Sequence, residues 1–128
     1  MLMGVLVIVL AIVAVVATTV AAAVGRLGPN PFAGLRFGHV RDSPAAWRAG
    51  HRAAVPLVVV GGLVAIACVG APVVGGWSDD AAAPAILAGT GVLLVSVLAG
   101  TWRANTAARA VSEGEGEGRG AGRASPRA

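Results

Sequence analysis

The sequence predicts an all-α, polytopic membrane protein with three transmembrane helices, an interfacial amphipathic helix and a disordered C-terminal tail. The first observation is compositional: 56% of the 128 residues are hydrophobic and only 12% are charged, whereas a soluble domain carries about 25% charged residues. The second is that three uncharged runs are each long enough to cross a bilayer as a helix. The third is that the arginines all lie between or after these runs, in a one-sided pattern.

The first predicted span covers residues 1–25. Its uncharged run, residues 2–24, would extend about 34 Å as a helix, which is enough to cross a hydrocarbon core of about 30 Å. Its start, "MLMG", lacks the positive charge of a secretory signal peptide, and the run exceeds the usual apolar length of about 7–15 residues. We therefore expect this helix to be retained.

The second and third predicted spans cover residues 53–76 and 81–102, and a short outer loop, 77–80, joins them. Arg52 precedes the second span, and two aspartates and an arginine enclose the third. A charged side chain at mid-membrane costs roughly 2.5–3.5 kcal/mol, so these charges mark the ends of the spans. The runs themselves contain no ionisable Asp, Glu, Lys, Arg or His, which disfavours a proton-coupled transporter.

The distribution of arginines predicts the orientation in the membrane. The first loop, 26–52, and the tail, 103–128, hold five arginines each, and the outer loop holds none. By the positive-inside rule, the first loop and the tail face the cytoplasm, and the N-terminus and Asp79-Asp80 face outward. Because all the basic residues are Arg and the chain is rich in Ala, Gly and Val, we expect a bacterial cytoplasmic membrane.

The tail, 103–128, ends in a stretch of Gly, Glu and Arg without an apolar face, so we expect it to be disordered. Its alternating glycines do not indicate a phosphate-binding loop, because no strand is predicted before them and no helix after them.

Small residues recur at four-residue spacing within the spans, which permits close approach of helices in a bundle or in a homo-oligomer. The pairs are Ala17/Ala21, Gly61/Ala65, Ala85/Gly89 and Ser96/Gly100.

The first loop contains the start of a helix that we expect to lie at the membrane interface. Residues 28–31 are turn formers, Ser43 suits an N-cap and Pro44 suits the first helical position. Trp47 and His51 begin a helical face that runs into the second span. The spacing therefore predicts a short amphipathic helix that is nearly continuous with this span, and we expect Trp47 at the level of the lipid headgroups.

The polar residues of the loop lack the partners that catalysis or metal binding requires. A metal site needs three or four ligands; His39 and His51 lack further ones, and Cys68 lies about 25 Å along the helix from His51. Because no Ser/His/Asp set, carboxylate pair or cofactor fingerprint occurs, we expect no enzyme activity, cofactor or metal. The arginines flank the apolar runs and do not form one basic face, which argues against nucleic-acid binding. If the loop packs, it would allow a cation–π contact between Arg36 and Trp47.

The string "GLRFGHVRDSPAAWRAGHR", residues 34–52, together with Asn30 before it, resembles the signature of the SdpI family of bacterial membrane proteins. That family reads Asn-x-x-x-Gly-Ile-Arg-Thr-Pro, then a Ser, then Trp-Arg-x-x-His-Arg entering a hydrophobic span. Phe37-Gly38 stands where the family has Thr-Pro. The matching positions are Asn30, Gly34, Arg36, Ser43, Trp47, Arg48, His51 and Arg52.

The resemblance implies toxin immunity and signalling. The family's namesake protects a bacterium from its own secreted membrane-active peptide and holds a transcriptional repressor at the membrane. The implied partners are the lipid bilayer, a peptide toxin and a cytoplasmic repressor, and the motif would be structural or bind a partner. The toxin would meet either the outer face, including Trp77, Asp79 and Asp80, or the faces of the helices. The alternative is a structural or accessory membrane module without a toxin role.

Overall fold

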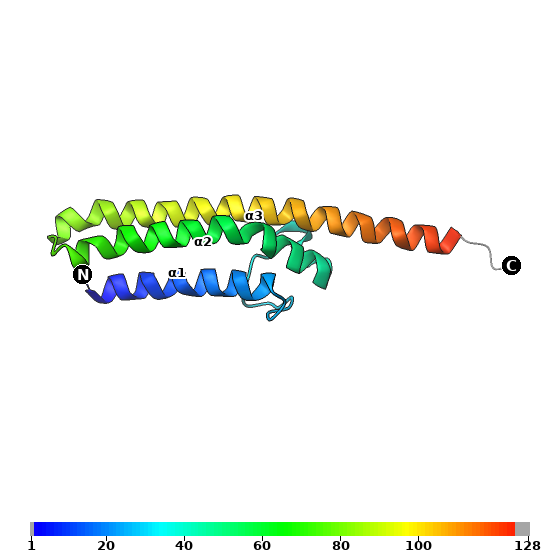
Figure 1. Cartoon of the computed structure of the whole chain (residues 1–128), viewed down its shortest axis with the longest axis horizontal. Coiled ribbons are helices and arrows are strands. Elements are labelled where there is room, and N and C mark those ends of the chain that lie inside the picture. The colour runs from blue at the N-terminus through cyan, green and yellow to red at the C-terminus, as the bar shows by residue number, and fades with distance from the viewer. Residues whose placement is uncertain (1, 125–128) are drawn as a thin grey trace.

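The structure is a computed structural model that describes the backbone of residues 2–124 and the side chains of residues 2–119. Its elements are α1 (Leu2–Ala23), the 3-10 helix η1 (Gly38–Arg41), α2 (Pro44–Val74) and α3 (Asp79–Ala124). The long helices run side by side, with α2 packed against both α1 and α3, and α3 extends well beyond the other two (Figure 1). All three are long and apolar enough to cross a membrane. The predicted helical membrane architecture is therefore confirmed.

The apolar helix α1 is followed, two residues after Ala23, by a glycine in the left-handed region. Gly25 has φ +82°, and the amides of Gly25 and Arg26 donate to the carbonyls of Ala22 and Ala21 at 3.2 and 2.9 Å. This is a Schellman motif, which satisfies carbonyls that the end of the helix would otherwise leave free. The chain consequently turns sharply out of α1 into the loop.

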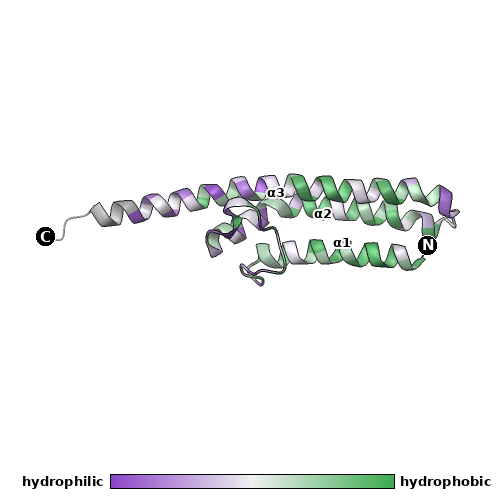
Figure 2. Ribbon diagram, turned by 180° about the vertical axis from the view of Figure 1, so that it is seen from behind, coloured by the Kyte–Doolittle hydropathy of each residue, from purple (hydrophilic) through white to green (hydrophobic). Residues whose placement is uncertain are grey.

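The predicted interfacial helix and the second span form one helix, α2. Ser43 is its N-cap, since the Ser43 hydroxyl accepts a hydrogen bond from the Ala46 amide at 3.1 Å, and Pro44 is the first helical residue. Both predictions are confirmed. Figure 2 shows that hydrophobic residues follow the three parallel stretches of helix, whereas hydrophilic residues gather in the loop and along the far part of α3.

The interface between α2 and α3 is built from small residues. A Cβ atom added to Gly89 would lie 2.8 Å from the Cβ of Cys68, and one added to Gly61 would overlap Ser96. Gly100 faces Ala54 in the same way, at 3.5 Å. Between membrane helices, van der Waals packing rather than water exclusion drives association, so such close approach stabilises the pair. The close approach that the small-residue spacing permits is therefore found between α2 and α3.

The end of α3 differs from the expectation of a tail that is disordered from residue 103. The helix continues to Ala124, and Ala104 and Ala108 are fully buried. The physical reason is that alanines four residues apart offer a narrow apolar face, which packs against η1 and the start of α2. Arg109 and Glu113 add an ion pair of 2.7 Å on the exposed side. Residues 125–128 lie outside the described part of the chain.

Candidate functional site

The loop between α1 and α2 folds over one end of the helical bundle and forms a packed cluster there. Trp47 and His51, from the first turns of α2, are its centre, and both side chains are fully buried. Their rings stack with centroids 4.3 Å apart and planes tilted by 41°. We call this group the loop cluster; it consists of Leu27, Asn30, Gly34, Leu35, Val40, Trp47 and His51.

His51 joins the loop to α2 through both of its ring nitrogens. Nδ1 donates to the Trp47 carbonyl at 2.8 Å, and Nε2 accepts from the Leu35 amide at 2.9 Å. A ring that donates at one nitrogen and accepts at the other is the neutral imidazole. His51 precedes the apolar run that begins at Ala53, and burial lowers its pKa from the ordinary value of 6.5, against an opposing effect of the Trp47 carbonyl.

Trp47 is fully buried within the protein, so its ring is not exposed to lipid headgroups as an interfacial anchor would be. Its indole Nε1 donates to the Leu27 carbonyl at 2.8 Å, and the ring packs beneath the loop. The expected cation–π contact with Arg36 is also absent from the described contacts, because Arg36 is exposed and donates to the Pro31 carbonyl. An indole N–H needs an acceptor when it is buried, and the loop carbonyl supplies one.

Asn30 and Gly34 set the path of the loop. The Asn30 side-chain oxygen accepts from the amides of Phe32 and Ala33 at 2.9 and 2.8 Å, a turn that an asparagine side chain supports well. Gly34 has φ +94°, and a Cβ atom there would lie 2.8 Å from His51 Nε2 and 2.9 Å from the Trp47 ring. Only glycine fits both the backbone conformation and the available space.

Arg52 binds the end of α1, and Arg48 lies beside the turn that follows it. Arg52 Nε donates to the carbonyl of Ala23, the last residue of α1, at 3.0 Å. The Arg48 side chain lies beside Gly25, where a Cβ atom would be 3.2 Å from its Cδ. A cation at a helix C-terminus satisfies free carbonyls and interacts favourably with the helix dipole.

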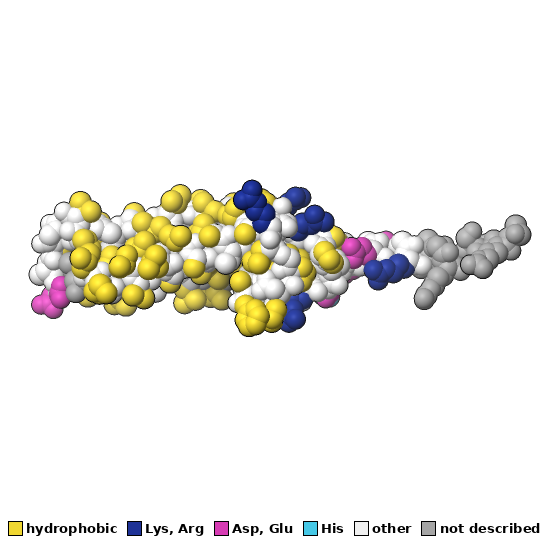
Figure 3. All heavy atoms as spheres, turned by 90° about the horizontal axis from the view of Figure 1, so that it is seen from below, with side chains coloured by type: hydrophobic (Ala, Val, Ile, Leu, Met, Phe, Trp, Pro, Cys, Tyr) yellow, Lys and Arg dark blue, Asp and Glu magenta, His cyan; other side chains and the backbone are white. Residues whose placement is uncertain are grey.

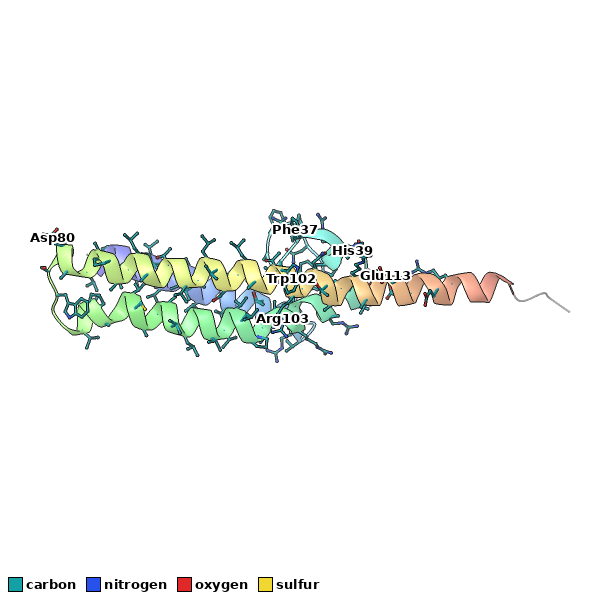
Figure 4. The ribbon with its side chains drawn as sticks, turned by 90° about the horizontal axis from the view of Figure 1, so that it is seen from above. Phe37, His39, Asp80, Trp102, Arg103 and Glu113 are labelled. Carbon is teal, nitrogen blue, oxygen red and sulfur yellow. The ribbon has the colours of Figure 1, made fainter. Side chains whose placement is uncertain are left out.

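Sequence reasoning missed a second connection, between the loop and α3. The His39 amide donates to Asn105 Oδ1 at 2.9 Å. Asp42 Oδ2 contacts His39 Nδ1 at 2.8 Å and accepts from the Ser112 hydroxyl at 3.1 Å; the His39 bond lowers the pKa of the Asp42 carboxyl. The available signal was the seven-residue spacing of Asn105 and Ser112, which places them on one helical face. Figure 4 shows His39 and Phe37 on the loop beside α3.

The departure from the family signature at Phe37-Gly38 has a structural explanation. Gly38 has φ +55°, and the Asn105 side chain lies against it where a Cβ atom would be. Proline is restricted to φ near −65°, so the Thr-Pro of the family pattern could not adopt this backbone conformation. Here glycine opens η1 and makes room for Asn105.

The predicted outer residues Trp77, Asp79 and Asp80 lie at the opposite end of the bundle from the loop cluster and are all exposed. Asp80 marks that end in Figure 4. Asp79 and Asp80 form the first turn of α3, where negative charge is stabilised by the helix dipole. The predicted site residues therefore divide into two groups at the two ends of the molecule.

The described residues contain no group of three or more His, Cys, Asp or Glu side chains placed to hold a metal ion. Within the same residues, each buried side-chain nitrogen or oxygen has a hydrogen-bond partner. The loop cluster is thus a saturated polar network, which rigidifies the end of the bundle.

Replacing Gly34 by alanine is expected to destabilise the loop cluster by about 1–3 kcal/mol, because the backbone conformation is unfavourable for alanine and the new methyl group meets His51 and Trp47. Thermal unfolding of the detergent-solubilised protein measures this. Gly28→Ala is the matched control, since a Cβ atom at Gly28 has no neighbour within 4 Å. Equal melting temperatures for the two variants would contradict the packing described here.

Acid is expected to destabilise the protein through His51. Its folded-state pKa is lowered, so the unfolded chain binds the proton more readily. The contribution of His51 to stability is therefore complete above pH 6.5 and is lost as the pH falls from there towards the folded pKa. Melting temperatures at pH 7.5 and below 6 test this; a His51→Gln variant should show a flatter pH dependence than the parent, and an equally steep one would contradict the role given to His51.

The fold and the site define an integral membrane protein of three helices in which a polar loop cluster ties the ends of the helices together. The chain belongs to the SdpI/YfhL protein family, whose sequence model matches residues 26–103, more than half of the chain. At this coarse level, the chain falls among membrane proteins of the immunity and signalling type. No curated protein and no solved structure matches the chain. The match covers the loop, α2 and the apolar part of α3.

Proposed function

We propose that the protein is a non-enzymatic immunity and sensing protein of a bacterial cytoplasmic membrane, which protects against a membrane-active peptide toxin and relays its presence to a cytoplasmic regulator. In this proposal the N-terminus lies outside, and the first loop and the C-terminal end lie in the cytoplasm. The observation that carries the proposal is that Gly34, Trp47 and His51 of the family motif meet in the loop cluster. The arginine-rich end then faces the cytoplasm, in agreement with the positive-inside rule.

The loop cluster is suited to sensing because contacts in and around it reach all three helices. Arg52 binds the end of α1, His51 belongs to α2, and the His39 amide binds Asn105 of α3. A peptide that changes the packing of the helices in the membrane would therefore change the geometry of this cluster. Arg36 is exposed beside it and would offer a regulator a positive charge.

A survival assay tests the proposal. A susceptible bacterium that expresses the protein is challenged with the secreted peptide encoded beside the native gene. We expect protection to fall with Arg36→Ala, which removes an exposed motif charge, and to persist with Arg109→Ala, which removes an exposed arginine that only pairs with Glu113. Equal protection by both variants at equal membrane levels would contradict a role for Arg36.

The second candidate is a structural or accessory membrane module. The saturation of the buried polar groups favours it, because a cluster that serves only packing needs no free donor or acceptor. The two candidates differ in the response of the wild-type protein to the toxin. A structural module would insert in the membrane but give no protection. Deleting it would change only the membrane assembly to which it belongs.

A further inference from the structure

A groove of about 290 Å³ lies between α1 and α2 within the apolar part of the bundle. Only hydrocarbon lines it: Val13, Val16, Ala17 and Val20 from α1, and Val59, Gly62, Leu63 and Ile66 from α2. The groove is open along its side, so in a membrane it is in contact with the acyl chains of the lipids. Shape and lining therefore suit a single extended hydrocarbon chain.

Two arginines lie on the α2 face that lines this groove. Arg48, Arg52, Val59, Leu63 and Ile66 follow one another at spacings of four, seven, four and three residues, which keeps them on one side of a helix. Arg52 lies about 10 Å along the helix from Val59, at the end of the apolar run. Its Nε bond to Ala23 of α1 places the guanidinium between the same two helices.

The charge at this end of the groove is not neutralised by nearby carboxylates among the described contacts. Asp42 is bonded to His39 and Ser112, and Glu113 is paired with Arg109, so these acids lie on the α3 side. A second hollow, of about 260 Å³, lies between the 25–29 segment and Arg48 and continues the surface beyond the end of α1. Figure 3, which looks onto the α1 side, shows apolar side chains along the bundle and basic side chains where that stretch ends.

We propose that this groove, with Arg48 and Arg52 at its end, is a binding site for one anionic phospholipid. One acyl chain lies between α1 and α2, and the phosphate meets the two guanidinium groups, a pairing that arginine makes well. The bound lipid fills the groove and stabilises α1 against α2. The proposal is independent of a toxin role, because it requires only the groove and the arginines.

Native mass spectrometry of the purified full chain, exchanged into phosphatidylglycerol or phosphatidylcholine of the same acyl composition, tests the site. We expect one phosphatidylglycerol to be retained in preference to phosphatidylcholine. A basic residue near the membrane surface contributes about fivefold to the preference for anionic lipid, so Arg48→Gln should lower the preference by about that factor. Arg109→Gln is the matched control, since it removes an exposed arginine from α3, and its preference should equal that of the parent.

Ala17→Phe tests the groove itself, because Ala17 is exposed there and a phenyl ring would fill the space. This variant should retain less of either lipid, while circular dichroism reports whether its helices are intact. Equal retention of the two lipids by the parent, or unchanged retention by Ala17→Phe, would overturn the proposal. A dimer mass that Ala17→Phe abolishes would also overturn it, since a second copy of the chain would then occupy the groove.

Discussion

Replacing Trp47 by alanine is expected to destabilise the folded protein by about 3–5 kcal/mol, the range for removing a large aromatic side chain from a core. The side chain is 0% exposed, so the substitution leaves a cavity beneath the loop. It also removes the donor to the Leu27 carbonyl and the ring on which His51 stacks. The cluster lies outside the apolar runs, so folding moves the Trp47 side chain from water into the protein. The usual hydrophobic cost of truncating a buried side chain therefore applies.

Trp102→Ala is the matched control for this prediction. Trp102 is 73% exposed and lies on α3 near the end of its apolar stretch. Figure 4 marks its place on the helix. Its removal takes away the same side chain without opening a cavity. Thermal unfolding followed by circular dichroism in one detergent compares the two variants, and hydrogen exchange of the Leu35 amide reports on the cluster directly. A loss of stability in Trp102→Ala as large as in Trp47→Ala would contradict the role given to Trp47.

Charge and hydropathy predicted the spans because a bilayer disfavours charged side chains. The end of each span is therefore marked by charged residues next to it in the sequence. Ser43 and Pro44 were also local signals, since an N-cap acts on amides within one turn. The small-residue pairs Gly61/Ala65 and Ser96/Gly100 predicted a close interface, although not which helices would meet. These features required no knowledge of distant contacts.

The loop cluster could not be predicted in the same way, because its bonds join residues far apart in sequence. The Leu35 amide meets His51, and the His39 amide meets Asn105, sixty-six residues later. Trp47 fits either an interfacial anchor or a buried core by its spacing, and only the path of the loop over it decides between them. The glycine- and glutamate-rich end of the chain suggested disorder for the whole tail. The buried face formed by Ala104 and Ala108 was therefore not predicted.

Replacing Gly61 by alanine is expected to separate α2 from α3, with a cost of about 1–3 kcal/mol for overpacking. The new Cβ atom would overlap the Cβ and hydroxyl of Ser96, which cannot move away because they belong to the neighbouring helix. Gly70→Ala is the control within α2, since a Cβ atom at Gly70 has no neighbour within 4 Å. It should be neutral or slightly stabilising, because alanine favours a helix more than glycine does.

The double variant Gly61→Ala/Ser96→Gly makes this prediction decisive. Removing the Ser96 side chain opens the space that the new methyl group needs, so the double variant should regain most of the stability lost in Gly61→Ala. The coupling energy between the two substitutions should fall within about 0.5–3 kcal/mol, the range for residues in direct contact. Unfolding in increasing dodecyl sulfate measures all four proteins. Additive effects would mean that Gly61 and Ser96 do not meet, and the small-residue interface between α2 and α3 would then have to be abandoned.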